Sequence, residues 1–511
     1  MNRAERMSAS DGRERGAALR WGVGFLLVAT VVAFAFRTSG VAIDDFYITY
    51  RYALHLATGR GFVFNPGEHV LGLSNPGLAL LLAGLRVVTQ EPVERLATAV
   101  FASGLLLILA SLFAAARMPD RRLEVLGGGL LLASSSFVWK AQGSEVSLAL
   151  ALLLGSACLA RRHPFAAGLL GGFAVWVRPD TGLGLAVLFF LLWIVGRSIP
   201  WRWCAGCAAV ILAGMTASYG YFGAVLPGTL ESKRHLAAIV GGSGFAERGF
   251  WQVGAETWLH HAGSWGGIVL VASGVVGQVF IFRNWGLVGR LLVGYGGVNA
   301  LVYPVLGVPF SIWYVFPAVA SIYFGVSACG FELGRRLGRA LSLRKKATAG
   351  ACLLGLLALA IGAGEATVRN GGWWLRFEEL PRQRAYREAA IWIRGHSRES
   401  ESIGFGEVGV VGFYSGRPVE DLLGLVTPRS LPFVARRDLV GAFLARPTEW
   451  VLYHTRRRST RPIVRQKWFP KTYRETARFP QSDGEGAVVV FRRRPGAKLP
   501  PARPPVGLGP S

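Results

Sequence analysis

Apolar runs separated by short clusters of arginine recur from the N-terminal region to roughly residue 364. A helix that crosses a bilayer needs roughly 15–22 mostly apolar residues, and the shorter runs meet this need if they tilt or extend polar ends to the interface. The sequence therefore predicts a polytopic α-helical membrane protein with about eleven spans. The predicted spans are 21–37, 94–116, 123–138, 145–160, 164–177, 182–196, 203–222, 266–282, 290–307, 312–331 and 347–364.

The composition supports a membrane protein and argues against a soluble one. Hydrophobic residues make up 52% of the 511 positions and charged residues only 17%. A soluble chain of this length needs more surface charge. Glycine, present 67 times, is typical of closely packed membrane helices.

The basic residues predict the orientation of the chain. They give a net charge of +26 and concentrate in alternate connections, as cytoplasmic loops do. Eleven spans that start from a cytoplasmic N-terminus place the C-terminal domain outside. We predict a multi-pass protein of the bacterial cytoplasmic (inner) membrane with an external, periplasmic C-terminal domain. The same basic residues suit contact with anionic membrane lipids, so no nucleic acid partner is predicted.

The predicted spans divide the chain into four regions. These are a cytoplasmic tail (1–20), a transmembrane domain (21–364), an external α/β domain (365–495) and a Pro-rich disordered tail (496–511).

The first external loop (38–93) is predicted to hold two short helices. Its apolar run 76–89 would invert every later loop if it crossed the membrane, so we expect it to lie in the outer interface. In the C-terminal domain, the pattern predicts a helix over 381–396, a strand and turn over 402–416, and strands over 448–455 and 486–493.

Neither a cofactor nor a metal site is predicted. The cysteines lie in or beside apolar runs, and Cys204 and Cys207 are interpreted as packing residues rather than as a redox or metal pair. His260 and His261 are adjacent rather than one helical turn apart, so they do not have metal-ligand spacing.

Two adjacent carboxylates, Asp44 and Asp45, follow the first span and begin a predicted helix. On that helix Tyr47, Arg51 and His55 share one polar face, and the other face is apolar, so we expect the helix to lie flat on the bilayer. The carboxylates have two possible roles, as N-terminal helix caps or as a general base at the lipid–water boundary.

The stretch that contains these residues, DDFYITYRYALHLATGRGFVFNPGEHVLGLSNP, resembles the first external loop of bacterial GT-C membrane glycosyltransferases. That group includes protein O-mannosyltransferases, lipid A aminoarabinose transferases and mycobacterial arabinofuranosyltransferases. The resemblance continues through QGSEVSLALALLL, WVRPDTG, YFGAVLPGTLESKR and YSGRPVEDLLGL, so it covers most of the chain in order.

The resemblance implies an inverting glycosyltransferase that uses a sugar on polyprenyl phosphate as its donor. An acidic residue of the first external loop then activates the acceptor hydroxyl, a role that falls on Asp44 or Asp45, with Asp44 favoured. The acceptor is an envelope glycan, lipid or protein on the outer face of the membrane. No cofactor is implied, although some members of the superfamily need a divalent cation.

Cations are needed to bind the donor phosphate. The candidates are Lys233, which matches its motif best, and Arg234, Arg51 and Arg178. Each of them could instead contact lipid headgroups. Further candidates for substrate binding are Tyr47, His55, Glu145, Trp313 and Tyr314.

Some of these candidates have a simpler explanation. Glu145 could pair with Lys140, and Trp313 and Tyr314 could belong to an interfacial aromatic belt. The sequence also departs from the family pattern at GSEVS, LPGT and RPDT, which leaves the sugar and the acceptor open.

Two other classes of function remain open at this point. A secondary transporter or flippase would show internal repeats and ionisable residues near the membrane midplane, and neither is evident. A non-catalytic envelope protein would use its external domain for binding only.

Overall fold

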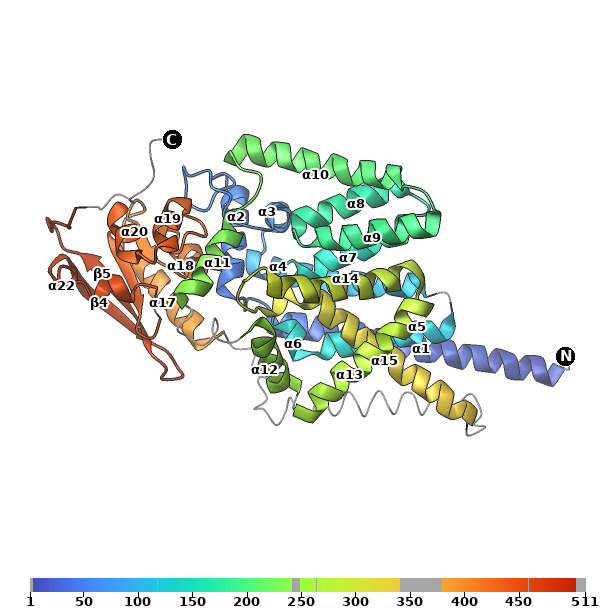
Figure 1. The fold of residues 1–511 in the computed structure, drawn as a ribbon. Helices are drawn as coiled ribbons and strands as arrows, with labels where there is room; N and C mark the ends of the chain where they lie inside the picture. The colour runs from blue at the N-terminus through green and yellow to red at the C-terminus, as the bar shows by residue number, and fades with distance from the viewer. Residues whose placement is uncertain are drawn as a thin grey trace.

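The computed structural model describes residues 3–116, 118–240, 249–262, 264–340, 379–457 and 459–501. A bundle of helices carries a five-stranded sheet domain at one end, which Figure 1 shows in orange and red. The N-terminal helix α1 (Arg3–Thr38) extends from the opposite end of the bundle.

The helices of the bundle after α1 are α4 (Val93–Ala115), α5 (Pro119–Ser134), α6 (Ser136–Trp139), α7 (Val146–Leu159), α8 (Pro164–Val177), α9 (Thr181–Gly196), α10 (Trp201–Phe222), α13 (Ser264–Asn284), α14 (Gly286–Val305) and α15 (Phe316–Ala340). Each predicted span that falls on described residues corresponds to helix, although the span 123–138 is divided between α5 and α6 and the helix for 312–331 runs from Phe316 to Ala340.

Five helices in the described part of the chain are long and apolar enough to cross a membrane, and they identify a multi-pass membrane protein. They cover Arg20–Thr38, Val93–Ala115, Trp201–Phe222, Gly266–Asn284 and Phe316–Ala340. Shorter apolar helices such as α7 and α8, with 14 residues each, complete the bundle. The predicted span 347–364 lies outside the described residues, so the number of eleven spans and their orientation stay predictions.

Glycine allows two of the long helices to touch along their backbones. A methyl group at Gly277 of α13 would overlap the backbone of Gly325 in α15, and one at Gly325 would overlap Gly274. Close contact between small residues is a common way for helices to associate in lipid.

The loop between α1 and α4, which the sequence predicts as the first external loop, holds the two predicted helices, α2 (Asp44–Ala57) and α3 (Pro76–Thr89). That α2 lies flat on the bilayer stays a prediction, but ten of its fourteen residues are buried, so protein surrounds most of the helix. Tyr50 and Ala53 on the apolar face are fully enclosed, and Tyr47 and Arg51 on the polar face are nearly so. The helix lies between α3 and α18 (Val408–Ser415) of the C-terminal domain.

The C-terminal domain has a mixed sheet with the strand order β2-β1-β3-β5-β4. Strands β1 and β3 are parallel, whereas β5 runs antiparallel to both β3 and β4. The strands are β1 (Ile403–Phe405), β2 (Val419–Asp421), β3 (Trp450–His454), β4 (Tyr473–Pro480) and β5 (Ala487–Arg493).

Several predictions for this domain are confirmed, and one is wrong in part. The helix over 381–396 is α17 (Pro381–His396), and β1, β3 and β5 lie within the predicted strand segments. The segment after β1, predicted as a turn, forms the helix α18. Shorter helices α19 (Leu431–Ala435), α20 (Leu439–Ala445), α21 (Arg461–Val464) and α22 (Phe469–Thr472) complete the domain.

One apolar core joins the bundle to the sheet domain. Phe46 of α2 and Leu78 of α3 belong to the same buried cluster as Val411 of α18 and Trp450 of β3. Two further helices, α11 (Thr229–Val240) and α12 (Phe250–Ala262), come from the segment between α10 and α13 and lie at this junction (Figure 1). Burial of this shared apolar surface fixes the domain against the end of the bundle.

Candidate functional site

A pocket of about 480 Å³ lies at the junction between the bundle and the sheet domain. Part of its wall is apolar and includes Leu183, Leu226, Leu230 and Leu306, of which Leu226 is 80% exposed. Another part is polar. It includes Asp45, Thr49, Asn75, Glu145, Arg178, Asp180, Lys233, Tyr303 and Tyr314.

Lys233 and Asp45 form an ion pair in this pocket. Lys233 Nζ lies 3.2 Å from Asp45 Oδ2 and donates a hydrogen bond of 2.8 Å to the hydroxyl oxygen of Tyr314. Although burial disfavours the ammonium, Tyr314 and Asp45 outweigh it, and the pKa of Lys233 lies above its ordinary value. Lys233 is therefore a permanent cation.

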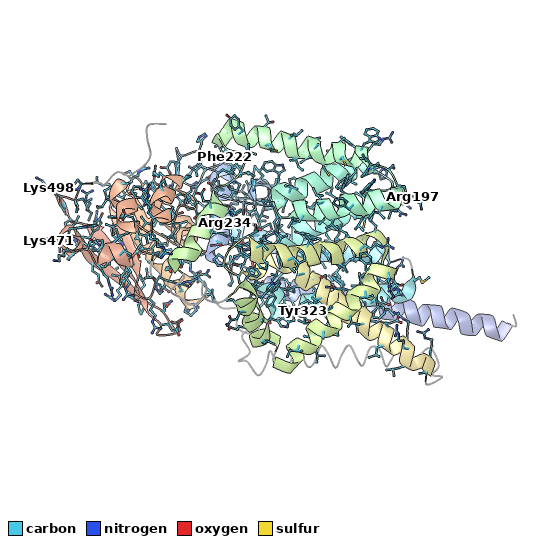
Figure 2. The ribbon with its side chains drawn as sticks, viewed as in Figure 1. Arg197, Phe222, Arg234, Tyr323, Lys471 and Lys498 are labelled. Atoms are coloured by element: carbon cyan, nitrogen blue, oxygen red, sulfur yellow. The ribbon has the colours of Figure 1, made fainter. Side chains whose placement is uncertain are left out.

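Helix α11 brings Lys233 to the pocket. Its neighbour Ser232 is fully buried and donates a hydrogen bond of 2.8 Å to the carbonyl oxygen of Leu423 in the sheet domain. Arg234, the next residue, is exposed and donates from Nε to the carbonyl oxygen of Leu306 at 2.9 Å. Figure 2 labels Arg234 at the junction between α11 and the bundle. The structure thus places Lys233 in the pocket and Arg234 beside it, outside its lining.

Arg178 is held by two carboxylates. Nη1 lies 2.6 Å from Glu145 Oε1 and Nε lies 2.7 Å from Asp180 Oδ1. Nη2 donates to the hydroxyl of Tyr303 at 2.8 Å, and that hydroxyl donates to Asp180 Oδ2 at 2.7 Å. A guanidinium that already faces two anions is compensated, so it stabilises the wall of the pocket rather than offering free positive charge.

The network around Glu145 continues into the first external loop. Asn75 donates from Nδ2 to Glu145 Oε2 at 2.8 Å, and Thr49 donates to Asn75 Oδ1 at 2.8 Å. Glu145 is thus shared between Asn75 and Arg178. Asp180 and Tyr303 were not among the predicted site residues, although Asp180 belongs to the RPDT motif.

Asp44 lies in different surroundings from Asp45. Its carboxylate accepts hydrogen bonds from the backbone N–H groups of Val410, at 2.8 Å, and Gly409, at 3.3 Å, in the first turn of α18. Burial, together with the nearby carboxylate of Glu407, raises the pKa of Asp44 to about 7. Asp44 is 7% exposed, whereas the side chain of Asp45 is 39% exposed. Asp44 therefore fastens α2 to α18, and Asp45 faces the pocket.

The structure does not bring Tyr47, Arg51 and His55 to the pocket lining. The Tyr47 hydroxyl lies 3.2 Å from that of Tyr414. Arg51 donates from Nε to the carbonyl oxygen of Phe64 at 2.7 Å and from Nη2 to that of Arg417 at 2.7 Å. Their shared helical face was predicted correctly, but it faces the protein interior.

His55 completes this face of α2. Its Nδ1 lies 2.9 Å from the carbonyl oxygen of Val63, and burial lowers the pKa of His55 to about 4. A neutral imidazole therefore holds the loop against α2.

Trp313 and Tyr314 do line the pocket, as a sugar-stacking role requires. The Tyr314 ring stacks on that of Tyr303, with centroids 4.6 Å apart. Trp313 meets Phe46 edge to face at 5.2 Å. These rings form a rigid aromatic side of the pocket.

A second cavity of about 1120 Å³ adjoins the first. Asp45, Val308, Trp313 and Leu425 line both spaces and separate them. Within the described ranges, no group of three or more histidine, cysteine, aspartate or glutamate side chains has an arrangement that could hold a metal ion.

Comparison with known proteins gives one family match and several solved structures. Residues 375–494 match a family described as a domain of unknown function, DUF8728. A sequence search of curated proteins finds no match. The crystal structure of ArnT from Cupriavidus metallidurans in the apo state is similar with a TM-score of 0.56 at 14% identity, covering 95% of this chain and 100% of that one.

A second similar structure is that of the same ArnT bound to undecaprenyl phosphate. It has a TM-score of 0.54 at 14% identity and covers 94% of this chain and 99% of that one. ArnT is an aminoarabinose transferase of the GT-C family. The similarity runs through both the bundle and the sheet domain, so the chain has the fold of ArnT, the GT-C fold that the resemblance predicted.

Proposed function

We propose that this protein is a glycosyltransferase that moves a sugar from a polyprenyl-phosphate donor to an acceptor of the cell envelope at the outer face of the cytoplasmic membrane. The fold supports a reaction of this kind, and undecaprenyl phosphate, the lipid part of such a donor, is bound in one of the similar ArnT structures. The pocket supports it independently.

The observation that carries the proposal is the ion pair between Lys233 and Asp45, 3.2 Å apart in a pocket with one apolar wall. The apolar wall suits the first isoprene units of the donor, and the ammonium of Lys233 suits its phosphate. When the donor phosphate binds Lys233 in place of Asp45, the Asp45 carboxylate loses its ion-pair partner and becomes available to accept a proton.

The reaction needs few groups. The acceptor hydroxyl attacks the anomeric carbon, and its proton passes to Asp45. The bond between that carbon and the phosphate oxygen breaks, and polyprenyl phosphate leaves with the electron pair. One displacement inverts the anomeric configuration. The phosphate is a good leaving group without protonation, so a base and a cation suffice.

The other charged residues support this pair. We propose that Asp44 is a positioning residue, since its carboxylate holds the start of α18, although the resemblance favoured it as the base. Arg178, with Glu145, Asp180 and Tyr303, keeps the polar wall in place.

Separate substitutions test these roles. We expect Asp45→Asn to lower the rate of sugar transfer about 10²- to 10⁴-fold, because a general base contributes that much, while donor binding persists. Lys233→Met should instead raise the KM for the donor at least tenfold. Arg234→Ala, on the same helix but outside the pocket, is the matched control. It should leave both the rate of sugar transfer and the KM for the donor unchanged. The measurements are transfer of radiolabelled sugar and donor binding with the full chain in detergent.

Three results would contradict the proposal. Full transfer after Asp45→Asn combined with loss after Asp44→Asn would exchange the two roles. Full transfer by the double variant would remove the aspartate base. Movement of the intact donor from one leaflet of a vesicle membrane to the other, without sugar transfer, would identify a flippase.

A further inference from the structure

The second cavity opens toward water on the side of the sheet domain. Its rim includes Arg456 after β3 and Asp483 and Glu485 between β4 and β5, all three exposed. The stretch 307–311, between α14 and α15, lines the cavity as well. A solute can therefore reach Asp45 from the aqueous side without passing through the apolar wall of the first pocket.

Carboxylates outnumber guanidiniums around this cavity by five to three, in a chain whose net charge is +26. Two of its arginines already face one carboxylate, since Arg382 Nε lies 3.5 Å and Arg457 Nε 3.6 Å from Glu407. An anionic solute would find little free positive charge here. The carboxylates are Asp44, Asp45, Glu407, Asp483 and Glu485, and the guanidiniums are Arg382, Arg456 and Arg457.

A neutral hydrogen-bond donor lies deep in the same cavity. His454, at the end of β3, is 3% exposed, and its Nδ1 accepts from the backbone N–H of Arg456 at 3.2 Å. This bond leaves the proton on Nε2, which is buried and makes no well-aligned hydrogen bond to any described residue, while Gln481 lies near enough to the ring to raise its pKa in part. Burial lowers the pKa of His454, so the ring is uncharged near neutral pH.

Other uncharged polar groups surround His454. Gln481 is 8% exposed and Ser459 is 6% exposed, and both line the cavity. Trp313 lines both cavities, so its ring can pack against a sugar face between them. A buried donor that lacks a partner is costly unless a ligand or water satisfies it.

We propose that this cavity binds the acceptor, and that the acceptor is an uncharged, hydroxyl-rich glycan that enters from the aqueous side. The inference rests on the proposed function and adds the chemical class of the acceptor to it. The Nε2–H of His454 donates to an acceptor oxygen, and Gln481 and Ser459 bind neighbouring hydroxyl groups. The reacting hydroxyl reaches Asp45, which lines both cavities, and gives its proton to that carboxylate when the glycosidic bond forms.

The acceptor class can be tested with purified full-length protein. Polyprenyl-phosphate-linked sugars with tritium in the sugar are incubated with three pools from the bacterial envelope: neutral water-soluble glycan, water-soluble glycan retained on an anion exchanger, and a lipid extract. We expect the label in the neutral glycan. Label in the anionic glycan or in the lipid overturns the inference and leaves the proposed function standing. Transfer to none of the three, nor to envelope proteins assayed beside them, counts against the proposed function itself.

Variants of the cavity link the acceptor to these residues. His454→Phe keeps an aromatic ring but removes the Nε2 donor, and Gln481→Leu serves as a second variant in case the first one folds poorly. Either should raise the KM for the neutral glycan about tenfold, with kcat and donor KM nearly unchanged. The matched control is His396→Ala, because His396 stacks on Trp392 outside the cavity. Unchanged acceptor KM in both folded variants overturns the assignment of the cavity.

Discussion

Asp44 and Asp45 are adjacent in the chain, but the two side chains perform different tasks. Successive residues of a helix point about 100° apart, so one carboxylate meets α18 while the other faces the pocket. Asp44 accepts backbone hydrogen bonds from Val410 and Gly409, and Asp45 pairs with Lys233. Neighbouring carboxylates that share a helix terminus in this way have different surroundings, and we propose that only Asp45 takes part in the reaction.

The burial of Asp44 predicts a pH-dependent stability. Its pKa rises from an ordinary value of 3.8 to about 7, so the folded chain holds this proton more tightly than the unfolded chain. The contribution of Asp44 to the free energy of unfolding therefore falls as the pH rises from about 4 to about 7. We expect the melting temperature of the unchanged protein to fall between pH 5 and pH 7. The melting temperature of the Asp44→Asn variant should fall less, because asparagine does not titrate. Parallel melting curves for both proteins would contradict this expectation.

At the scale of elements, the contact between α2 and α18 holds the two parts of the molecule together. Gly409 stands where α18 begins, and its backbone lies against the backbone of Asp44. Only a residue without Cβ fits there, because a methyl group would overlap the carbonyl oxygen of Asp44. The close approach also allows the N–H groups of α18 to reach the Asp44 carboxylate.

A substitution at this contact should separate the helices. We expect Gly409→Ala to destabilise the protein by roughly 3 kcal/mol, because backbone must move to accept the methyl group. Gly395→Ala in α17 is the control, since nothing lies within 4 Å of the added methyl group, and it should stabilise by up to about 1 kcal/mol. Melting in detergent measures both, and equal melting temperatures for the two variants would contradict the proposed contact.

At the scale of the molecule, the first external loop completes the sheet of the C-terminal domain. Asn65 uses its amide as a strand would, donating from Nδ2 to the carbonyl oxygen of Val419 at 2.9 Å and accepting from its N–H at 3.0 Å. Val419 belongs to β2, an edge strand of the sheet. A loop from the bundle thus satisfies backbone groups that would otherwise be buried without partners.

Removal of the Asn65 amide should lower the free energy of unfolding of the protein. Asn65→Ala leaves two buried backbone groups of Val419 unpaired, which costs about 2–4 kcal/mol. We expect faster hydrogen exchange at Val419 and a lower melting temperature. Asn284→Ala serves as the control, because Asn284 is exposed and its amide donates to the carbonyl oxygen of Phe280 within its own helix. Protection at Val419 as strong as in the unchanged chain would show that the loop does not close the sheet.

The sequence predicted the helices well because apolar length and periodicity are local properties. The run 164–177 and the helix over 381–396 have the predicted bounds. The burial of α2 could not be predicted, since its partner α18 comes from a segment that lies far along the chain and had been interpreted as a turn.

The candidate site was predictable only in part, for the same reason. Lys233, Glu145, Arg178 and Tyr314 were selected and meet in one pocket. His454 was not selected, because a histidine at the end of a strand has no local pattern that distinguishes a ligand-binding side chain from a core residue.

The shared core of α2 and α18 also imposes an order on biosynthesis. Ala57 ends α2 and Val408 begins α18, so the ribosome must add about 350 residues between them, which takes roughly 20–70 seconds at ordinary elongation speeds. During that interval the nascent chain already occupies the membrane while its loop helix awaits its partner. A newly made molecule therefore completes the core shared by α2 and α18 only when translation is nearly finished. Premature stop codons upstream of α18 should yield protein that is inserted in the membrane but inactive.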